Sequence, residues 1–135
     1  MAKTFKLEVV SPERVVLSQD VKSLVAPGSE GYLGILADHA PLMAELRLGE
    51  IRITDPDGHE MHIATSGGFM QVADNTVRIL ADTAEIEEEI DVARAEEAVK
   101  RAEARIRERT EGLDHARAEA ALKRAVNRLR IARGV

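Results

Sequence analysis

The sequence contains no cysteine, which excludes disulfide bonds and thiolate metal sites. Aromatic residues make up only 2% of the chain, so its core must be built from Val, Ile, Leu and Ala, and a hydrophobic content of 44% is sufficient for one. No apolar run approaches the roughly 18 residues that a membrane-spanning helix needs, and the N-terminal residues alternate in polarity instead of forming a signal peptide. These absences predict a soluble, cytosolic chain with one domain, or one domain and an appendage.

The formal net charge of −5 conceals two halves of opposite sign. Residues 1–90 carry seven basic and sixteen acidic side chains, whereas residues 91–135 carry twelve basic and eight acidic ones. After His115 there are six basic residues and a single acid, Glu119. A basic stretch of this kind can bind nucleic acid or a membrane surface, but here no aromatic residue is present to stack on bases or to anchor in lipid. We therefore expect no nucleic-acid partner, and we expect the basic tail to bind the acidic half or another acidic partner.

Short apolar runs separated by Gly, Pro, Asn and Asp fill the chain as far as residue 80. Strands at a spacing of eight to twelve residues, with no helical pattern between them, are typical of an antiparallel sandwich or a flattened barrel. Segments 27–31 and 73–75 indicate turns, and the Asp-Gly pair at 57–58 indicates a tight hairpin. The expected strands cover residues 5–10, 15–17, 21–26, 32–36, 42–48, 50–54, 61–65, 68–72 and 76–80.

The pattern changes between Glu85 and Ala95, where the apolar period passes from two to about 3.6. Asp91 is well placed to cap a helix, and the glutamates before it are favourable near the positive end of that helix. We predict a sandwich domain over residues 1–86, a hinge over 87–90 and a helical region over 91–135. The predicted fold class is α+β: an N-terminal antiparallel β-sandwich followed by a C-terminal antiparallel two-helix hairpin.

Two apolar seams predict the helices of this hairpin. Spacings of three and four residues indicate a first helix over 92–109, while Gly112 and Asp114 suit the end of that helix and the cap of the next. Both seams are rich in Ala, so at roughly 25 cal/mol per Å² the hairpin gains little from its own contact and is only marginally stable. The seams consist of Val92, Ala95, Val99, Ala102 and Ile106, and of Ala118, Leu122, Ala125, Leu129 and Ala132.

The first half contains no catalytic constellation. Asp38 and His39 are an acid–base pair by residue type, but neighbours in a strand point to opposite faces and cannot orient each other. Ser66 precedes two glycines in what is more simply a strand-end turn than a nucleophile elbow. His59 and His62 have the chemistry of metal ligands, although exposed hairpin histidines are the commoner case. We expect no metal site, and turnover assays would test the alternative of an enzyme built around Asp38 and His39.

Four stretches of the chain carry a resemblance to a known family. They are residues 28–42 (GSEGYLGILADHAPL), 66–72 (SGGFMQV), 77–84 (VRILADTA) and 122–129 (LKRAVNRL). In this order they resemble the epsilon subunit of bacterial and chloroplast F-type ATP synthase, and the resemblance covers essentially the whole chain. A Pro-Gly pair commonly precedes the family's histidine, where this chain has Ala37 and Asp38 as a turn variant.

The resemblance implies a non-catalytic subunit of the central stalk, or rotor. Its sandwich would bind the gamma subunit and rest on the c-ring, and Glu30, Gly31, His39 and Pro41 would face these partners. When extended along gamma, its hairpin would contact the acidic arm of a beta subunit, beside alpha, and so inhibit ATP hydrolysis. When folded down on the sandwich, the hairpin would permit hydrolysis. The chain would be peripheral on the cytoplasmic face of the bacterial plasma membrane and attached only through the complex. The residues implied in the beta-subunit contact are Lys123, Arg124, Arg128, Arg130 and Arg133.

Some bacterial members of this family bind ATP through a motif Ile/Leu-Asp-x-x-Arg-Ala. Ile90, Asp91, Arg94 and Ala95 match this motif in full. The further family positions map to Glu85, Arg101, Arg124 and Arg128, and the residue types match at all four.

The chemistry of this set fits a nucleotide. Guanidinium groups would surround the triphosphate, while Glu85 and Asp91 would accept hydrogen bonds from the adenine amino group or the ribose hydroxyls, with Arg94 holding Asp91 in place. Because the chain has no Walker-type glycine loop and no candidate base, ATP would be a regulatory ligand and not a substrate, and a Mg²⁺ requirement is left open. The alternative is a free-standing, non-catalytic ATP-sensing hairpin protein, which co-purification with alpha, beta and gamma would distinguish.

Overall fold

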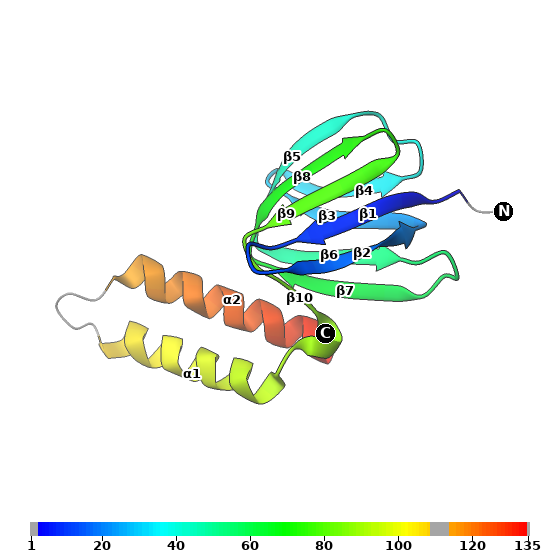
Figure 1. The fold of residues 1–135 in the computed structure, drawn as a ribbon. Helices are drawn as coiled ribbons and strands as arrows, with labels where there is room; N and C mark the ends of the chain where they lie inside the picture. The colour runs from blue at the N-terminus through cyan, green and yellow to red at the C-terminus, as the bar shows by residue number, and fades with distance from the viewer. Residues whose placement is uncertain (1–2, 109–113, 135) are drawn as a thin grey trace. The chain divides into compact units, whose positions relative to one another are not determined.

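The computed structural model describes residues 3–108 and 114–134, and it divides into two compact units, residues 1–87 and 88–135 (Figure 1). The first unit consists of strands and the second of helices. Each unit has its own packing and is described by itself. The predicted fold class, a β-sandwich followed by two helices, is confirmed.

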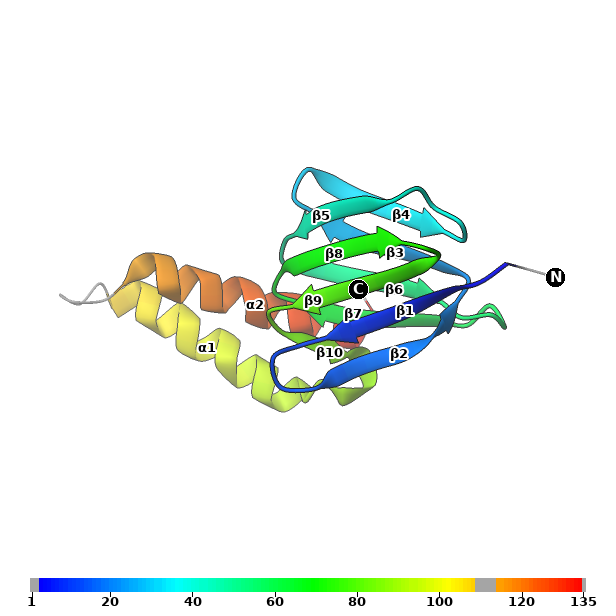
Figure 2. The same cartoon turned by 45° about the horizontal axis from the view of Figure 1, so that its top comes forward.

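The first unit is a single ten-stranded sheet that is folded on itself. The strand order is β10-β7-β6-β3-β5-β8-β9-β1-β2, and β4 pairs with β3 outside this path. β8, β9 and β1 form one layer, in front of β3 and β6 (Figure 2). The strands are β1 Phe5–Val10, β2 Val15–Val21, β3 Ser23–Gly28, β4 Gly31–Leu36, β5 Leu42–Leu46, β6 Gly49–Thr54, β7 Glu60–Thr65, β8 Gly68–Ala73, β9 Thr76–Ala81 and β10 Ala84–Ile86.

The core of this unit is aliphatic, as the composition predicts. Alternate residues of each strand point inward: Leu7 and Val9 of β1 and Ile79 of β9 are fully buried, together with Ile51 and Ile53 of β6. Phe5 is the single aromatic residue in the buried cluster of the described residues. Burial of each such side chain contributes roughly 1.5–3 kcal/mol, so this unit holds a substantial core of its own.

The strands differ from the expected ones at three places. β1 runs parallel to β9, whereas all other pairs are antiparallel. Residues 21–26 do not form one strand, because Val21 ends β2 and β3 begins at Ser23. Pro27 and Gly28, which were expected in a turn, end β3 instead.

Two glycines explain the extended end of β3. Gly28 lies opposite Gly31, so that only two residues close the β3–β4 hairpin. A Cβ at Gly28 would lie 2.6 Å from the carbonyl oxygen of Gly31, which permits only glycine at this close approach.

β10 is a strand that the sequence pattern does not predict. It spans only Ala84–Ile86 and precedes a 3-10 turn, η1 Glu87–Glu89, in an acidic stretch that favours a helix start. Its position depends on pairing with β7, where Ile86 lies opposite Ile63. Such a pairing comes from tertiary contact and not from local propensity.

The second unit contains two antiparallel helices, α1 Val92–Glu108 and α2 His115–Arg133. Both predicted N-caps are confirmed: an Asp91 carboxylate oxygen accepts the backbone N–H of Arg94 at 3.1 Å, and Asp114 accepts that of Arg117 at 3.1 Å. Gly134 ends α2 in the left-handed conformation. The predicted break at 110–113, including Gly112, lies outside the described residues.

Each helix buries alanines of its predicted apolar seam. Ala95 and Ala102 of α1 and Ala118 and Ala125 of α2 are at most 6% exposed. Near the base of the hairpin the Arg133 guanidinium forms an ion pair with Glu96, which links the end of α2 to the start of α1.

Candidate functional site

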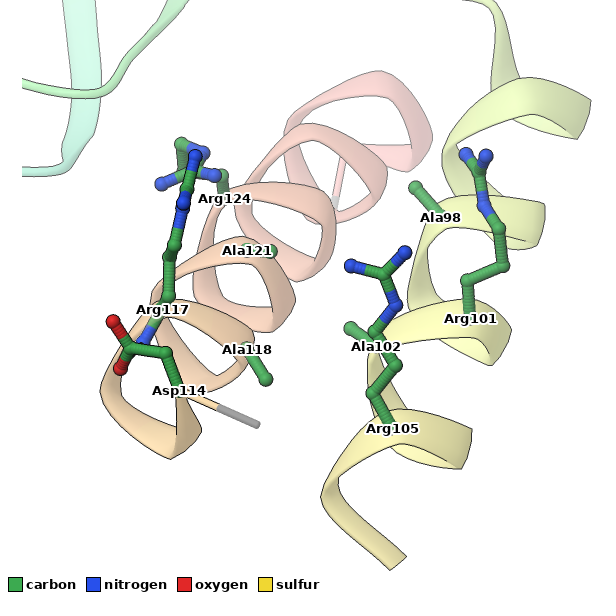
Figure 3. A pocket seen from close by; sticks show the side chains of 9 residues that line it. All are labelled: Ala98, Arg101, Ala102, Arg105, Asp114, Arg117, Ala118, Ala121 and Arg124. Carbon is green, nitrogen blue, oxygen red and sulfur yellow. Dashed lines mark hydrogen bonds between the residues drawn. The ribbon is translucent and has the colours of Figure 1, made fainter. Parts of the chain in front are cut away.

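A groove of about 550 Å³ lies between α1 and α2 (Figure 3). Alanine methyl groups lie along it, and four arginines line it, Arg101 and Arg105 from α1 and Arg117 and Arg124 from α2. The Arg117 and Arg124 side chains extend along the side of α2 that faces away from α1 (Figure 3). The remaining lining residues are Ala98, Ala102, Asp114, Ala118 and Ala121.

The electrostatics of this groove are dominated by positive charge. Within the described ranges, none of its four guanidinium groups forms an ion pair with a carboxylate. The one acid of the groove, Asp114, accepts the backbone N–H of Arg117 as the cap of α2. Guanidinium groups of this kind have the chemistry to donate hydrogen bonds to an anion.

The nucleotide residues implied by the resemblance occupy several places. Arg101 and Arg124 line the groove, and Arg128 lies one turn beyond Arg124 on α2. Asp91 and Arg94 lie at the start of α1. The contact between these two residues is the hydrogen bond from the backbone N–H of Arg94 to the Asp91 carboxylate. This is the geometry of a helix N-cap, and it does not involve the Arg94 guanidinium.

The remaining nucleotide residues implied by the resemblance are two apolar residues, Ile90 and Ala95, and one residue of the sandwich unit, Glu85. Ile90 and Ala95 are buried, at 7% and 0% exposure. Glu85 belongs to β10 of the first unit, where it lies opposite Ala64.

Two arginines of the groove, Arg105 and Arg117, were missed by the sequence reasoning. A signal for them was present, because Arg105 follows Arg101 by four residues and Arg117 precedes Arg124 by seven. Both spacings place side chains on one helix face. Without the pairing of the two helices, however, these arginines cannot be distinguished from the other basic residues of this region.

The basic residues implied in the beta-subunit contact lie on α2. Lys123, Arg124, Arg130 and Arg133 are exposed, and Arg128 is half-buried. Arg133 pairs with Glu96, and Arg130 donates to the Asn127 side chain at 3.3 Å. The helix therefore presents positive charge on its accessible surface.

The four residues implied in facing the c-ring or gamma do not form one cluster. Glu30 and Gly31 lie at the β3–β4 hairpin, at the start of β4, whereas His39 and Pro41 follow the other end of that strand. Glu30 and Pro41 are exposed, and the His39 Nδ1 atom lies 2.7 Å from the Ala40 carbonyl oxygen.

Asp38 lies in a turn and His39 follows it outside any strand, which corrects the interpretation of the two as neighbours in a strand. Asp38 has φ 61°, and its carboxylate lies 3.3 Å from Lys3 Nζ. Its backbone N–H donates to the Asn75 side chain at 2.8 Å. The two side chains thus have separate partners and do not form an acid–base pair.

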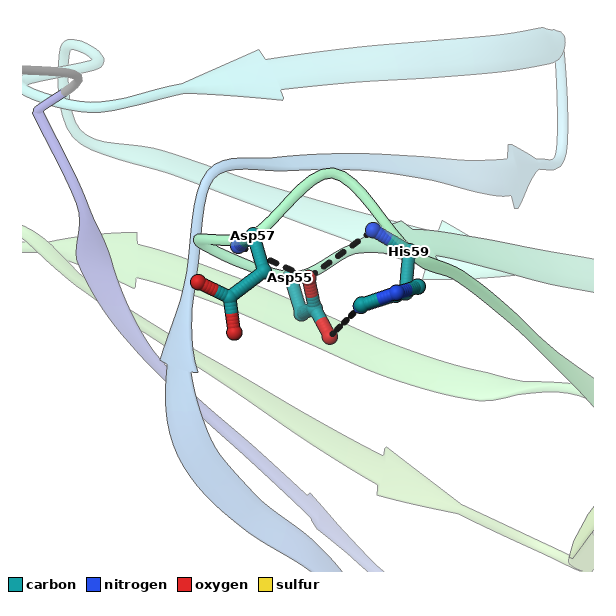
Figure 4. A group of neighbouring side chains, drawn as sticks. All are labelled: Asp55, Asp57 and His59. Atoms are coloured by element: carbon teal, nitrogen blue, oxygen red, sulfur yellow. Dashed lines mark hydrogen bonds and ion pairs between the residues drawn. The ribbon is translucent and has the colours of Figure 1, made fainter.

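The histidines of the β6–β7 hairpin also have acidic neighbours. In the turn, Asp55 Oδ1 accepts the backbone N–H groups of Asp57 and His59 at 2.9 Å each, so this carboxylate is part of the hairpin structure (Figure 4). The hydrogen bond from the His59 backbone lowers the pKa of Asp55. His62 is half-buried, with Glu50 at Nδ1 and Glu60 at 3.6 Å from Nε2.

An apolar row crosses the outer face of four neighbouring strands of the sandwich. Val15 lies opposite Val10, Val10 opposite Leu80, and Leu80 opposite Phe69, on β2, β1, β9 and β8. Val15, Leu80 and Phe69 are 61%, 60% and 55% exposed. Exposed apolar side chains that are contiguous across strands indicate a surface for a protein partner.

Comparison with known proteins identifies the family of both units. Residues 4–87 match the family described as ATP synthase, Delta/Epsilon chain, beta-sandwich domain, and residues 88–133 match ATP synthase, Delta/Epsilon chain, long alpha-helix domain. The ATP synthase epsilon chain of Pelotomaculum thermopropionicum is 53% identical over 108 residues, which cover 80% of each chain. That of Syntrophomonas wolfei is 51% identical over 108 residues, which cover 80% of this chain and 79% of the relative.

The chain belongs to the ATP synthase delta/epsilon family. Its sequence is similar to bacterial epsilon chains, which are subunits of the ATP synthase complex. No helix of the described residues is long and apolar enough to cross a membrane.

Two solved structures contain chains with a similar fold. A chain in the Euglena gracilis mitochondrial ATP synthase, in an assembly of OSCP, F1 and c-ring, has a TM-score of 0.76 and 26% identity, with coverage of 89% of this chain and 76% of that chain. A chain of the central stalk and c-ring of the Tetrahymena thermophila mitochondrial ATP synthase shares the fold, with a TM-score of 0.60 and 17% identity over 98% and 96% of the two chains.

Proposed function

We propose that this chain is the epsilon subunit of the central stalk in a bacterial F-type ATP synthase, where it couples F1 to the c-ring and restrains ATP hydrolysis. The observation that carries the proposal is the family match, which extends over residues 4–133 in two consecutive parts. The subunit has no catalytic role of its own. It is peripheral on the cytoplasmic face of the plasma membrane, to which only the complex attaches it.

The sandwich supplies the surfaces for the gamma subunit and the c-ring. The apolar row of Val15, Val10, Leu80 and Phe69 suits a protein partner, since covering it would remove exposed apolar side chains from water. We assign this row to gamma. Glu30, Gly31, His39 and Pro41, at the two ends of β4, are assigned to the c-ring and gamma contacts.

The helical unit supplies the regulation. The basic surface of α2 is complementary to an acidic arm of the beta subunit, and electrostatic attraction of this kind determines orientation and speeds association. The scarcity of large apolar residues between α1 and α2 keeps the two helices weakly joined, which allows them to separate along gamma.

ATP is proposed as the regulatory ligand that keeps the two helices together. The supporting observations are the complete motif at Ile90, Asp91, Arg94 and Ala95 and the groove that contains Arg101 and Arg124. A ligand that binds both helices of the joined hairpin stabilises it by an amount that grows with ligand concentration.

The test compares complexes of alpha, beta and gamma that carry either the full chain or a chain that ends at Glu87. Because the buried core of the sandwich lies entirely within residues 5–84, the shorter chain should fold and join the complex. We expect its complex to hydrolyse ATP several-fold faster than the complex with the full chain. Failure to assemble would contradict the role of the sandwich, and an unchanged rate would contradict the role of the helices.

A further inference from the structure

We propose that the open edge of β4 binds a second copy of this chain, which pairs its own β4 with it in the antiparallel direction. The chain outside the complex thus associates weakly into a two-fold symmetric dimer through one continuous sheet. The dimer goes beyond the proposed function, because it concerns the free subunit. Only its competition with assembly rests on that function.

β4 has one edge that no other strand covers. It pairs with β3 along its whole length, and within residues 3–108 and 114–134 no strand pairs with its other side. The strand lies at the outer margin of the sandwich (Figure 2). A groove of about 490 Å³ lies beside it, between the start of β4 and β5. The sandwich is therefore open to an incoming strand along β4.

Backbone groups point out from this edge at every second residue. Pro27 lies opposite Tyr32 and has no N–H, and its carbonyl accepts the backbone N–H of Arg47 on the far side of β3. Tyr32 therefore belongs to a pair without mutual hydrogen bonds, and such pairs alternate along an antiparallel ladder. The N–H and C=O groups of Tyr32, Gly34 and Leu36 accordingly point away from β3, toward the open side.

β4 lacks the features that usually protect an edge strand. Natural edge strands are commonly short, charged, bulged or interrupted by proline. At the two ends of the strand order, β10 has only three residues and includes Glu85, while β2 carries Asp20 and a register shift beside β1. β4 has six residues, none of them charged or proline, and its register with β3 is regular. An edge of this kind is a template for a further strand.

A second β4 fits this edge in a self-complementary register. With the two-fold axis at Gly34, Tyr32 lies opposite Leu36 of the second copy, and all three outward-pointing residues gain partners. Tyr32 and Leu36 are 53% and 65% exposed, so this cross-strand contact removes apolar surface from water. Gly34 at the axis has no side chain that keeps the strands apart. Self-complementarity of this kind is what an interface around a two-fold axis requires.

The size of the interface makes the dimer weak. One short strand from each copy buries much less than the roughly 1,200–2,000 Å² of a stable interface, so we expect a dissociation constant on the order of 100 µM. The residues assigned to the c-ring and gamma, Glu30, Gly31, His39 and Pro41, flank β4. A second copy on β4 covers the segment between them, so pairing and assembly exclude each other.

The experiment measures self-association of the full-length chain by sedimentation equilibrium between about 10 µM and 1 mM. The test variants are Gly34→Glu and Gly34→Lys, because a Cβ at Gly34 would have no neighbour within 4 Å and the fold should tolerate it. Each variant places two like charges face to face at the axis. The matched control is Ser18→Glu, which adds a charge at an exposed position of β2. Circular dichroism checks that all variants keep their fold.

We expect the wild type and Ser18→Glu to approach twice the mass of one chain at the highest concentration. The dissociation constant should rise roughly fivefold or more in each Gly34 variant alone. It should return toward the wild-type value in an equimolar mixture of the two, where Glu faces Lys. Amide hydrogen exchange at Tyr32, Gly34 and Leu36 should slow as the wild-type concentration rises.

Three results would overturn the inference. The first is a wild type that stays monomeric over the whole range. The second is association that Gly34→Glu leaves unchanged, which would place the interface elsewhere, such as at the apolar row. The third is a mixture of the Glu and Lys variants that associates no better than either alone.

The competition with assembly has its own test. A subcomplex of alpha, beta and gamma, added in excess, should convert the dimer into complexes that hold one copy of the chain. Binding of the paired chain would contradict the exclusion. A subcomplex that binds no chain at all would contradict the proposed function, whereas the dimer is decided by the sedimentation data alone.

Discussion

At the scale of single residues, Gly68 has the least room for a side chain among the described glycines of the sandwich. It has φ 144°, and a Cβ there would lie 2.1 Å from the carbonyl oxygen of Leu80 and 2.9 Å from the Cα of Ala81. These are backbone atoms of the neighbouring strand and cannot rotate away. The Ser66-Gly67-Gly68 stretch is thus explained by close approach of β8 and β9, with no nucleophile required.

We predict that Gly68→Ala lowers the free energy of unfolding by roughly 2–4 kcal/mol, because the added methyl group must push two paired strands apart. Chemical unfolding followed by circular dichroism measures this. Gly34→Ala is the control: it also lies in a strand, but its Cβ would have no neighbour within 4 Å. Equal stability changes in the two variants would refute the steric explanation.

At the scale of elements, the hairpin depends on few contacts. Alanines bury little area, so their packing contributes little free energy to the association of the two helices. The Glu96–Arg133 ion pair adds a contact between the start of α1 and the end of α2. Both partners are about half exposed, and such pairs contribute only about 0.2–1 kcal/mol.

Glu96→Gln should therefore increase hydrogen exchange in the last turn of α2 by a small factor. Glu97→Gln, its exposed neighbour, should not. A double-mutant cycle with Arg133→Gln should give a coupling of about 0.2–1 kcal/mol. Zero coupling would mean that the ion pair does not join the helices.

Elements also differ in how far the sequence predicts them. The two helices and their caps could be predicted because their signals are local: the apolar residues repeat with the helical period, and Asp91 and Asp114 stand where N-caps are needed. β10 and the parallel direction of β1 beside β9 could not, since both depend on partners distant in the chain. Arg101 could be singled out only through the family resemblance, while Arg105 and Arg117 became distinct only when the helices were placed side by side.

At the scale of the whole molecule, charge is divided between an acidic first part and a basic last part. In the proposed complex the basic surface of α2 carries the inhibition, while the sandwich carries the assembly. Neutralising that surface should therefore separate the two activities.

We predict that neutralising Lys123, Arg124, Arg128, Arg130 and Arg133 raises ATP hydrolysis by the complex several-fold and leaves assembly unchanged. Hydrolysis assays and gel filtration of the complex measure the two effects. ATP binding is measured in the same variants, because Arg124 and Arg128 belong to both proposed roles. Hydrolysis that stays blocked would show that inhibition depends on packing or on another subunit.

The parallel pairing of β1 with β9 has a consequence for how the chain acquires its structure. β1 lies between β2 and β9, so β1 completes its hydrogen bonding only when residues 76–81 have followed it out of the ribosome. A loop of some 65 residues must close before this pair forms, and its entropy cost delays folding. The sandwich can therefore mature only as the helical unit begins to emerge from the ribosome.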